Sequence, residues 1–533
     1  MPGGPQNADT KDTVPKVSPP APPAAPGDGT GASAADRSAH STDHLLTDLK
    51  GRTVRGGAVT LAAQAAKLLA TLVSTYILAR LLEPSDFGKV AMVTAFTGII
   101  ALFKDAGLSL ATIQKKDLSD AQVSTLFWIN VVVAVFLFAV AATVAPWIAA
   151  FYGSPDLEPI AVTLGATLVF AGASAQHHAL LRRQMRYGRL GALDVAALVV
   201  GVVVGITCAL FGLGAWSLVW MQMANAVATC VGAWVLCSWR PGAPAPLRDV
   251  KDLVGFGAHL TGAGALNYAA RNTDKLLLGR FFGDVIVGFY VKAYKLMMLP
   301  LNMVNAPLSS VAIPALSPIA HDADRYREAL LRTMEKAVVI TMLLAAFLVG
   351  AADWIVLALL GPKWIAAGPL LSLLGVAAFA QPISNAASWC LVSQGRAREI
   401  MRLSAIDTVI VVVAIVAGLP FGVAGVAASY ALASIAVRVP LQLFVVGRRG
   451  PVSLRDLWTT CAPGLVASGV ALAALGAFRL AGLSLHVWVL LVLAGLVWLA
   501  GGALGLAVTP RGRAAWRDLY GALPALTATR RQP

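Results

Sequence analysis

Charged residues are scarce in this chain. Asp, Glu, Lys and Arg make up 13% of its 533 residues, whereas an ordinary soluble domain carries about 25%. Apolar residues make up 57%, and runs of about 20 of them, enough to cross about 30 Å of hydrocarbon, recur along nearly the whole sequence. Short segments of alternating hydrophobicity, which a spanning barrel needs, are missing from it. The composition therefore predicts an all-α polytopic membrane protein.

The sequence also lacks the motifs on which many enzymes and metalloproteins depend. Its one Gly-Lys pair, Gly88-Lys89, is followed by Val, so there is no phosphate-binding loop of an ATPase. The five cysteines lie inside apolar runs without a C-x-x-C pair, which favours packing over metal binding. The triplet 322–324 is a D-x-D, but three residues in a short loop are weak support for catalysis. We expect no enzyme, no catalytic residue, no cofactor and no metal site.

Fourteen spans can be placed by length and hydropathy. Their expected bounds are 56–80, 90–112, 123–148, 158–179, 190–211, 215–238, 253–276, 284–310, 333–358, 366–391, 401–420, 423–445, 459–480 and 486–508. Polar residues interrupt spans seven and eight. The loops between spans are short, which argues against an extracytoplasmic catalytic domain.

The net charge of +15 could suggest a nucleic-acid partner, but the cations fall in short loops between spans. They gather in alternate loops, as orientation signals do. The other loops carry few, namely Arg80, Lys89, Arg280, Lys363 and Arg479. We therefore expect no nucleic-acid binding, and the charge pattern predicts that both termini lie in the cytoplasm. An even number of spans agrees with that orientation.

The organisation expected from these spans is two six-helix lobes followed by two further helices. Residues 1–50 are rich in Pro, Ala, Gly and Ser, and we expect a disordered cytoplasmic tail with no cleaved signal peptide. The N-lobe should cover 51–250 and the C-lobe 251–450. Spans thirteen and fourteen should cover 451–510, and a second cytoplasmic tail 511–533.

Two weak internal repeats support a duplicated six-span unit. The sequences at 79–90 and 279–290 share an Arg, two bulky apolar residues and a Gly eight residues after the Arg. The sequences at 211–220 and 421–430 both begin with Phe-Gly. The offsets of 200 and 210 residues agree with one another, as expected for two parallel lobes.

Five cations at or near membrane depth are the candidate binding residues: Lys67, Arg271, Lys275, Lys292 and Lys295. Charge at that depth is costly, so it usually faces a polar interior. The alternative is that 271–280 marks the outer end of span seven, where cations snorkel to lipid headgroups. That alternative explains Lys292 and Lys295 less well, because they lie about two and three turns inside span eight. Cations in a low-dielectric cavity suit a substrate that carries phosphates.

Acidic residues at similar depth are candidates for ion coupling. Asp274 lies three residues after Arg271 and can partner it. Asp407 in span eleven and Arg438 in span twelve can pair across the second lobe, either as coupling groups or as a structural bridge. The sequence alone favours neither use.

Three stretches together resemble a known family. ARLLEPSDFGKVAMVTAF at 79–96, KDAGLSLATIQKKD at 104–117 and NTDKLLLGRFFGDVIVGFYVKAYKLMMLP at 272–300 are similar to the Wzx-type polysaccharide exporters of the MOP superfamily. The resemblance covers about residues 50–450. It implies a MATE-like fold of two lobes around a V-shaped cavity.

The resemblance also implies an activity, the flipping of undecaprenyl-diphosphate-linked oligosaccharide across the bacterial cytoplasmic membrane for surface polysaccharide or lipopolysaccharide biosynthesis. Alternating access coupled to H⁺ or Na⁺ is the implied energy source, and the five cations named above would hold the diphosphate. We expect a monomer that works among membrane lipids beside glycosyltransferases and a polymerase. The alternatives are a MATE-type multidrug or cation antiporter, for which acidic cavity residues would be expected, and a lipid II flippase.

Overall fold

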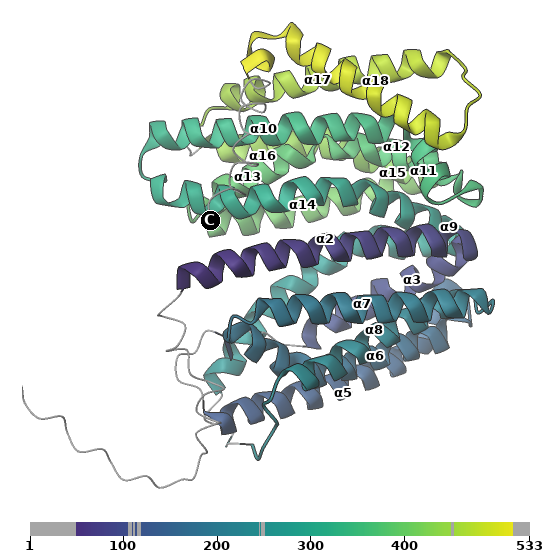
Figure 1. Cartoon of the computed structure of the whole chain (residues 1–533), viewed down its shortest axis with the longest axis vertical. Coiled ribbons are helices and arrows are strands. Elements are labelled where there is room, and N and C mark those ends of the chain that lie inside the picture. Colours follow the sequence, from purple (N-terminus) through teal and green to yellow (C-terminus); the bar gives the residue numbers. More distant parts are fainter. Residues whose placement is uncertain are drawn as a thin grey trace, which may run out of the picture.

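The computed structural model describes residues 49–104, 109, 112–113, 119–244, 246, 251–448 and 452–514; at 49–59, 61, 251–267 and 269–271 it describes the backbone alone. Throughout these ranges the regular structure is helical. Most of each tail predicted at 1–50 and 511–533 lies outside the described residues. The helices form two bundles and a final helix pair (Figure 1).

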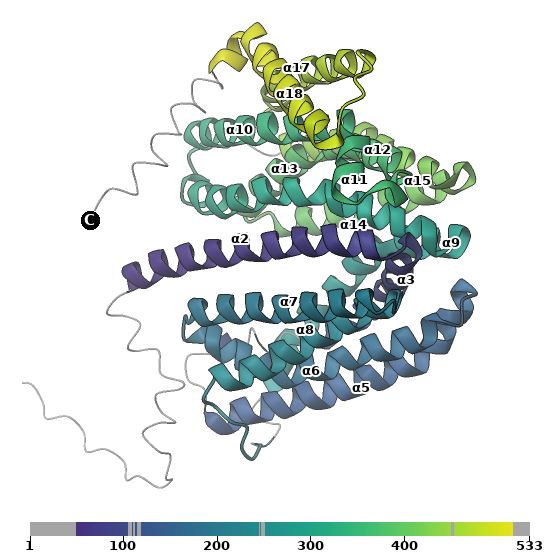
Figure 2. The same ribbon diagram turned by 45° about the vertical axis from the view of Figure 1, so that its right-hand side comes forward.

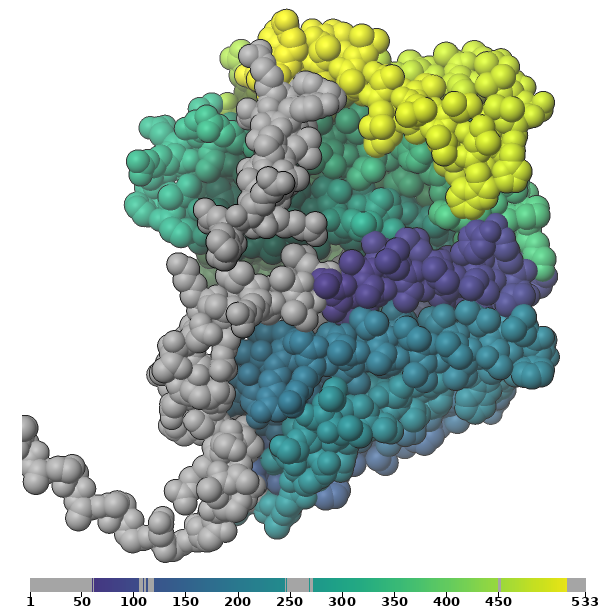
Figure 3. Space-filling view, viewed as in Figure 1, coloured from purple at the N-terminus to yellow at the C-terminus, as the bar shows by residue number. Residues whose placement is uncertain are grey.

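The N-terminal bundle contains six long helices. They are α2 (Leu49–Leu81), α3 (Pro84–Ala101), α5 (Asp120–Tyr152), α6 (Leu157–Arg183), α7 (Tyr187–Leu210) and α8 (Ala215–Leu236). Helix α2 packs on α7, and it lies along the boundary with the C-terminal bundle in both ribbon views (Figures 1 and 2). The space-filling view shows α2 as a purple band between the two bundles (Figure 3).

The C-terminal bundle contains longer and more broken helices. They are α9 (Lys251–Leu316), α10 (Ala323–Gly350), α11 (Ala352–Leu359), α12 (Ala367–Ala378), α13 (Gln381–Ser393), α14 (Ala397–Gly418), α15 (Gly422–Ala433), the π-helical turn η7 (Ser434–Arg438) and α16 (Val439–Arg448). The final pair, α17 (Leu454–Leu480) and α18 (Val487–Val508), follows, and α17 packs on α10. In Figures 1 and 2 this yellow pair covers the outside of the C-terminal bundle.

The helices match the predicted spans. Twelve helical stretches in the described part of the chain are long and apolar enough to cross a membrane. Two of them are long enough to hold two spans: α9 covers predicted spans seven and eight, and Ala397–Arg448 covers eleven and twelve. The predictions of an all-α polytopic membrane protein and of about fourteen spans are therefore confirmed.

Helix α9 bends where the sequence placed a boundary between spans. Gly283 has φ 80° and ψ −179°, so the helix is interrupted there. An L-residue with a side chain adopts this backbone only at a high steric cost, which a glycine avoids. The bend lets the second part of α9 turn back along the bundle.

Helices α3 and α9 approach one another at two equivalent glycines. A Cβ atom on Gly88 would lie 1.8 Å from the carbonyl oxygen of Asp284, and one on Gly288 would lie 2.0 Å from that of Pro84. Residues 84 and 88 correspond to 284 and 288 at the offset of 200 that the first repeat predicts. The contact, which we call the crossing, is thus reciprocal, as expected where two copies of one unit meet about a pseudo-two-fold axis.

The second repeat also appears in the backbone. Helix α6 covers Leu157–Arg183, and α12 with α13 covers Ala367–Ser393, so both bounds are shifted by 210. In the following turn, Arg186 has φ −81° and ψ 51°, while Arg396 has φ −79° and ψ 52°. The two bundles are therefore built on the same local frame.

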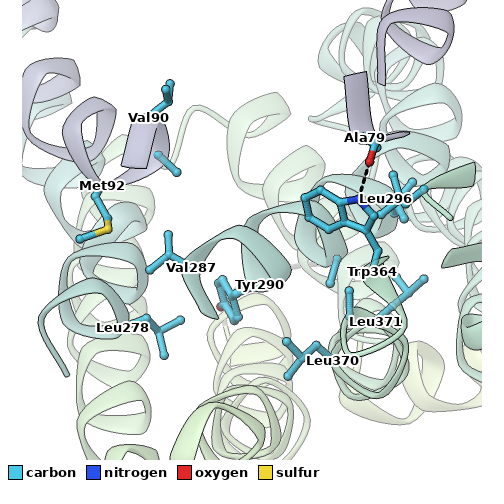
Figure 4. Close-up of a cluster of buried hydrophobic side chains, with 14 of the residues drawn as sticks. Ala79, Val90, Met92, Leu278, Val287, Tyr290, Leu296, Trp364, Leu370 and Leu371 are labelled. Carbon is cyan, nitrogen blue, oxygen red and sulfur yellow. Dashed lines mark hydrogen bonds between the residues drawn. The ribbon is translucent and has the colours of Figure 1, made fainter. Parts of the chain in front are cut away.

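A hydrophobic cluster lies around the crossing (Figure 4). Trp364 is fully buried, and its indole N–H donates to the carbonyl oxygen of Ala79 at 2.7 Å. Val287 and Tyr290 of α9 lie toward Met92 of α3 in the same cluster (Figure 4). Side chains from both bundles thus share one core at this end of the molecule.

Candidate functional site

Polar contacts close the end of the molecule at which α2 turns into α3, which we call the α2–α3 end. The Arg80 guanidinium donates to the carbonyl oxygens of Ala358 and Leu359 at 2.9 and 3.0 Å. Lys363 forms an ion pair with Glu83 at 2.6 Å. These contacts join the N-terminal bundle to the C-terminal end of α11 and to the turn that follows it. Together with the crossing they form a seal between the bundles.

Lys292 lies beside this seal and is held by aromatic rings. Its ammonium nitrogen is 3.6 Å from the centre of the Phe87 ring and 5.7 Å from that of Trp364. The residue is only 5% exposed. Ring faces attract a desolvated cation by about 2 kcal/mol, which offsets part of the cost of burial. Any contact between Lys292 and a substrate therefore requires these rings to move away.

The other predicted cations of α9 have different surroundings. Lys295 is exposed, one turn beyond Lys292. Lys275 donates from its ammonium group to Asn272 Oδ1 at 2.6 Å and is partly buried. The side chain of Arg271 lies outside the described residues. Lys275, Lys292 and Lys295 are thus all on the helix that forms the crossing.

Lys67 lies apart from these residues and has a partner that the sequence analysis missed. Its ammonium nitrogen is 2.5 Å from Asp194 Oδ2, so α2 and α7 are joined by an ion pair. The side chains are 28% and 40% exposed, which leaves both accessible to solvent. Nothing in the sequence pattern links two residues 127 positions apart, so Asp194 could be found only from the fold.

The three acidic and basic residues predicted for ion coupling lie together. Asp274, Asp407 and Arg438 line one cavity of about 390 Å³ inside the C-terminal bundle, which we call the C-bundle cavity. The predicted contact between Asp407 and Arg438 is present, with 3.4 Å between Oδ2 and the guanidinium. Gln442 donates to the same Oδ2 at 2.9 Å and accepts from Ser384 at 2.7 Å.

Two polar atoms of this pair have no hydrogen-bond partner within the described structure. They are Asp407 Oδ1 and Arg438 Nε, and both are buried. Asp274 is 7% exposed, and its Oδ1 accepts from the backbone N–H of Lys275 at 2.8 Å. A buried polar atom without a partner costs about 1–3 kcal/mol, so the ion pair leaves part of its hydrogen-bonding capacity unused.

Prolines explain why the cavity forms in this bundle. Pro440 lacks the N–H that would continue the helix, and the π-helical turn that carries Arg438 precedes it directly. Pro382 begins α13 in the same way after the break at 379–380. Turns of this kind are frequent at functional sites. Both prolines are visible in the sequence, but a proline within an apolar span does not by itself predict a cavity.

The D-x-D triplet has a structural explanation. Asp322 caps the N-terminus of α10 by accepting from the backbone N–H of Arg325 at 3.2 Å. No group of three or more His, Cys, Asp or Glu side chains with the geometry of a metal site occurs among the described residues. The five cysteines all fall in the described ranges, where they are free, and four of them are buried.

Comparisons of the sequence find polysaccharide biosynthesis proteins. The family model described as "Polysaccharide biosynthesis protein" matches residues 77–369. The chain is 26% identical over 306 residues to the teichuronic acid biosynthesis protein TuaB of Bacillus subtilis (strain 168), a match that covers 57% of this chain and 63% of TuaB. It is 25% identical over 382 residues to the lipopolysaccharide biosynthesis protein WzxC of Escherichia coli (strain K12), covering 70% of this chain and 77% of WzxC. The match thus spans less than two thirds of TuaB.

Comparisons of the structure find two related folds. The lipid II flippase MurJ in an inward closed conformation superposes with a TM-score of 0.68 at 12% identity, over 86% of this chain and 99% of MurJ. An inward-facing multidrug resistance MATE family transporter of the MOP superfamily gives 0.58 at 16% identity, over 76% and 99%. At such identities the likeness shows the fold alone. The predicted MATE-like fold is confirmed.

Proposed function

Because this chain belongs to the polysaccharide biosynthesis protein family, we propose that it flips an undecaprenyl-diphosphate-linked oligosaccharide across the bacterial cytoplasmic membrane. The function is that of a transporter in surface polysaccharide biosynthesis and not that of an enzyme. It works by alternating access, in which the two bundles separate first at one face of the membrane and then at the other.

The observation that carries this proposal is the seal at the α2–α3 end. Arg80, Glu83 and Lys363 fasten the two bundles together there, and the cations Lys292 and Lys295 lie on the helix that runs from the crossing. A carrier needs one closed end and a charged interior. The alternation of loop charge assigns this end to the outer face and both termini to the cytoplasm.

The diphosphate is the part of the substrate that these cations recognise. We assign Lys275 and Lys295 to its initial binding, with Arg271 on the same helix and Lys67 on α2 as further contacts. Lys292 would contact the diphosphate only after the rings of Phe87 and Trp364 move away from its ammonium group. Each ammonium or guanidinium offers charge-assisted hydrogen bonds, which are roughly twice as strong as neutral ones.

The energy source stays a prediction, with H⁺ or Na⁺ as the ion. The predicted coupling residues are Asp274, Asp407 and Arg438. We keep this assignment because all three line one cavity. We expect a monomer in contact with membrane lipids, which receives its substrate from glycosyltransferases and passes it to a polymerase.

The experiment that tests this function is a leaflet-accessibility assay in proteoliposomes. Fluorescent undecaprenyl-diphosphate oligosaccharide is incorporated, and an impermeant reductant reports how fast label leaves the protected leaflet. The full chain should accelerate exchange over empty liposomes. Lys275→Ala, Lys295→Ala and Arg271→Ala should each slow it by about tenfold, the change expected for loss of one charge-assisted hydrogen bond. Arg513→Ala is the control, because Arg513 is an exposed cation beyond α18.

The same assay separates the alternatives. Exchange of lipid II with no exchange of the oligosaccharide lipid would make the protein a lipid II flippase. Uptake of a cationic dye driven by an ion gradient, with neither lipid exchanged, would make it a MATE-type antiporter; Asp274 and Asp407 in one cavity are the observation in favour of that second candidate.

A further inference from the structure

The C-bundle cavity is a second polar site, separate from the cations of α9. Helices α9, α13, α14, α15 and α16 with the π-helical turn surround it. Its volume of about 390 Å³ falls within the range of about 300–1,000 Å³ that small-molecule sites occupy. Two of its lining residues, Ser388 and Ser404, are exposed, so the cavity is open on that side. Both serines lie in the halves of α13 and α14 that adjoin the turn between these two helices.

Most polar groups of the lining are uncharged and can both donate and accept hydrogen bonds. Hydroxyl and amide side chains come from five helices: Tyr294, Gln381, Ser384, Ser388, Ser404, Thr408, Tyr430 and Gln442. The two tyrosines also offer flat apolar faces. A ligand with many hydroxyl groups and C–H faces matches this lining, whereas a purely apolar ligand would leave it unpaired.

The charged groups of the lining further restrict the class of ligand that the cavity can bind. Arg438 already supplies a positive charge next to Asp407, which disfavours a free metal cation at that carboxylate. Asp274 and Asp407 outnumber the one guanidinium, which disfavours a diphosphate. A neutral hydroxyl can donate to a carboxylate and accept from a guanidinium, so it suits a lining that carries both groups.

We propose that the C-bundle cavity binds a sugar unit of the substrate and so serves as its glycan subsite. The proposal rests on the proposed function, since the sugar is the head of the lipid-linked oligosaccharide. The lipid diphosphate would lie on the cations of α9, and the first sugars would reach into the C-terminal bundle. Sequence variation in the cavity lining would then set which glycan the protein carries.

The test compares two lipids that differ only in the sugar. The full chain in nanodiscs is titrated with undecaprenyl diphosphate and with the undecaprenyl-diphosphate oligosaccharide extracted from a producing strain, and Kd is measured for each. Asp407→Asn should weaken binding of the oligosaccharide lipid by at least about tenfold, since a charge-assisted contact is lost. Gln442→Leu should weaken it as well, because it removes the amide that lines the cavity and donates to Asp407 Oδ2. Both variants should leave the Kd of undecaprenyl diphosphate unchanged.

A matched serine pair controls for folding. Ser384→Ala removes the hydroxyl that holds Gln442, whereas Ser174→Ala removes the serine 210 residues earlier, whose hydroxyl only bonds carbonyl oxygens of its own helix. Ser384→Ala should weaken oligosaccharide binding severalfold, and Ser174→Ala should not. Lys295→Ala should weaken binding of both lipids, which shows that the assay detects the diphosphate contact.

Equal weakening for both lipids, or no change for either, would overturn the glycan subsite while the wild-type Kd still supports the transport function. Saturable ²²Na⁺ binding that disappears in Asp407→Asn, while the Kd of the oligosaccharide lipid stays unchanged in that variant, would also overturn it and leave the cavity as an ion site alone. If the wild-type protein binds and exchanges neither lipid, the proposed function fails instead. These results are distinct from one another.

Discussion

The α7–α8 hairpin of the N-terminal bundle and the α14–α16 region of the C-terminal bundle occupy equivalent places but are packed differently. In the first, Gly201 and Gly205 let the helices meet closely: a Cβ on either would lie 2.8 Å from an atom of Met221. The residues 210 positions later are Val411 and Ile415, and both line the C-bundle cavity. Glycines thus allow close helix packing in the N-terminal copy of the repeat, whereas larger side chains line a cavity in the C-terminal copy.

Prolines account for the rest of the difference. Pro382 and Pro440 break helices in the C-terminal bundle, while Gly172 and Cys230 stand at the equivalent places of the unbroken helices α6 and α8. The breaks turn Ser384 toward Gln442, and Gln442 toward Asp407. One copy of a duplicated helical unit can therefore acquire a polar cavity through a few helix-breaking residues.

The largest effect is expected at the crossing, to which each copy of the repeat contributes one glycine. Gly88→Ala and Gly288→Ala each put a methyl group within about 2 Å of a carbonyl oxygen, so the seal cannot form as observed. Exchange of the fluorescent oligosaccharide lipid in proteoliposomes should fall at least tenfold for each, and by similar factors. Gly469→Ala, at a site with no atom within 4 Å, should keep wild-type rates. A large difference between the exchange rates of the two crossing variants would show that the two glycines do not play equivalent parts in transport.

The second prediction asks whether the helix breaks make the cavity. Pro440→Ala restores an N–H and removes a ring clash, which together cost a helix interior about 3 kcal/mol. We expect thermal unfolding at a higher temperature and lipid exchange several times slower, because Arg438 would rotate out of the cavity as the π-helical turn relaxes. Pro463→Ala in α17 is the matched control, since that proline lies inside a helix that does not line the cavity. A more stable Pro440→Ala protein with full exchange activity would show that the break is incidental.

The third prediction compares the ion pairs of the two bundles by double-mutant cycles. Asp407 and Arg438 are both 18% exposed, and Asp407 also accepts from Gln442, so their coupling energy should be about 2 kcal/mol or more. Lys67 and Asp194 are 28% and 40% exposed, and their coupling should stay below about 1 kcal/mol. Chemical unfolding of Asp407→Asn, Arg438→Gln and the double variant, beside the corresponding Lys67→Met and Asp194→Asn set, measures both couplings. Equal coupling energies would remove the distinction between the bundles.

Much of this architecture could be predicted from the sequence, because hydropathy and loop charge report on each span separately. The repeats at offsets of 200 and 210 also predicted the equivalence of Gly88 with Gly288. Two contacts between distant segments could not be predicted. Asp194 meets Lys67 only through packing of α2 on α7, and the ring cage of Lys292 combines residues from three distant segments.

The cavity was missed for a related reason. Asp274, Asp407 and Arg438 were singled out by their charge at membrane depth, but the neutral residues around them carry no such cost and give no signal in a single sequence. Ser384 and Gln442 look like ordinary helix residues until the breaks at Pro382 and Pro440 bring them together. Local sequence therefore located the charged residues and missed the hydrogen-bonding groups around them.

The smallest effect is expected in the turn that the two bundles share. Met185 has φ 52° and its counterpart Gly395 has φ 66°, so one copy places a side chain where the other has none. A left-handed backbone costs a non-glycine residue about 1 kcal/mol, so Gly395→Met should lower the unfolding temperature by one or two degrees. Met185→Gly should raise it by less, because the partly buried methionine loses some packing as the strain is relieved. Differential scanning fluorimetry in nanodiscs can measure both unfolding temperatures. A shift in the same direction for the two variants would mean that backbone strain does not act alike in the two turns.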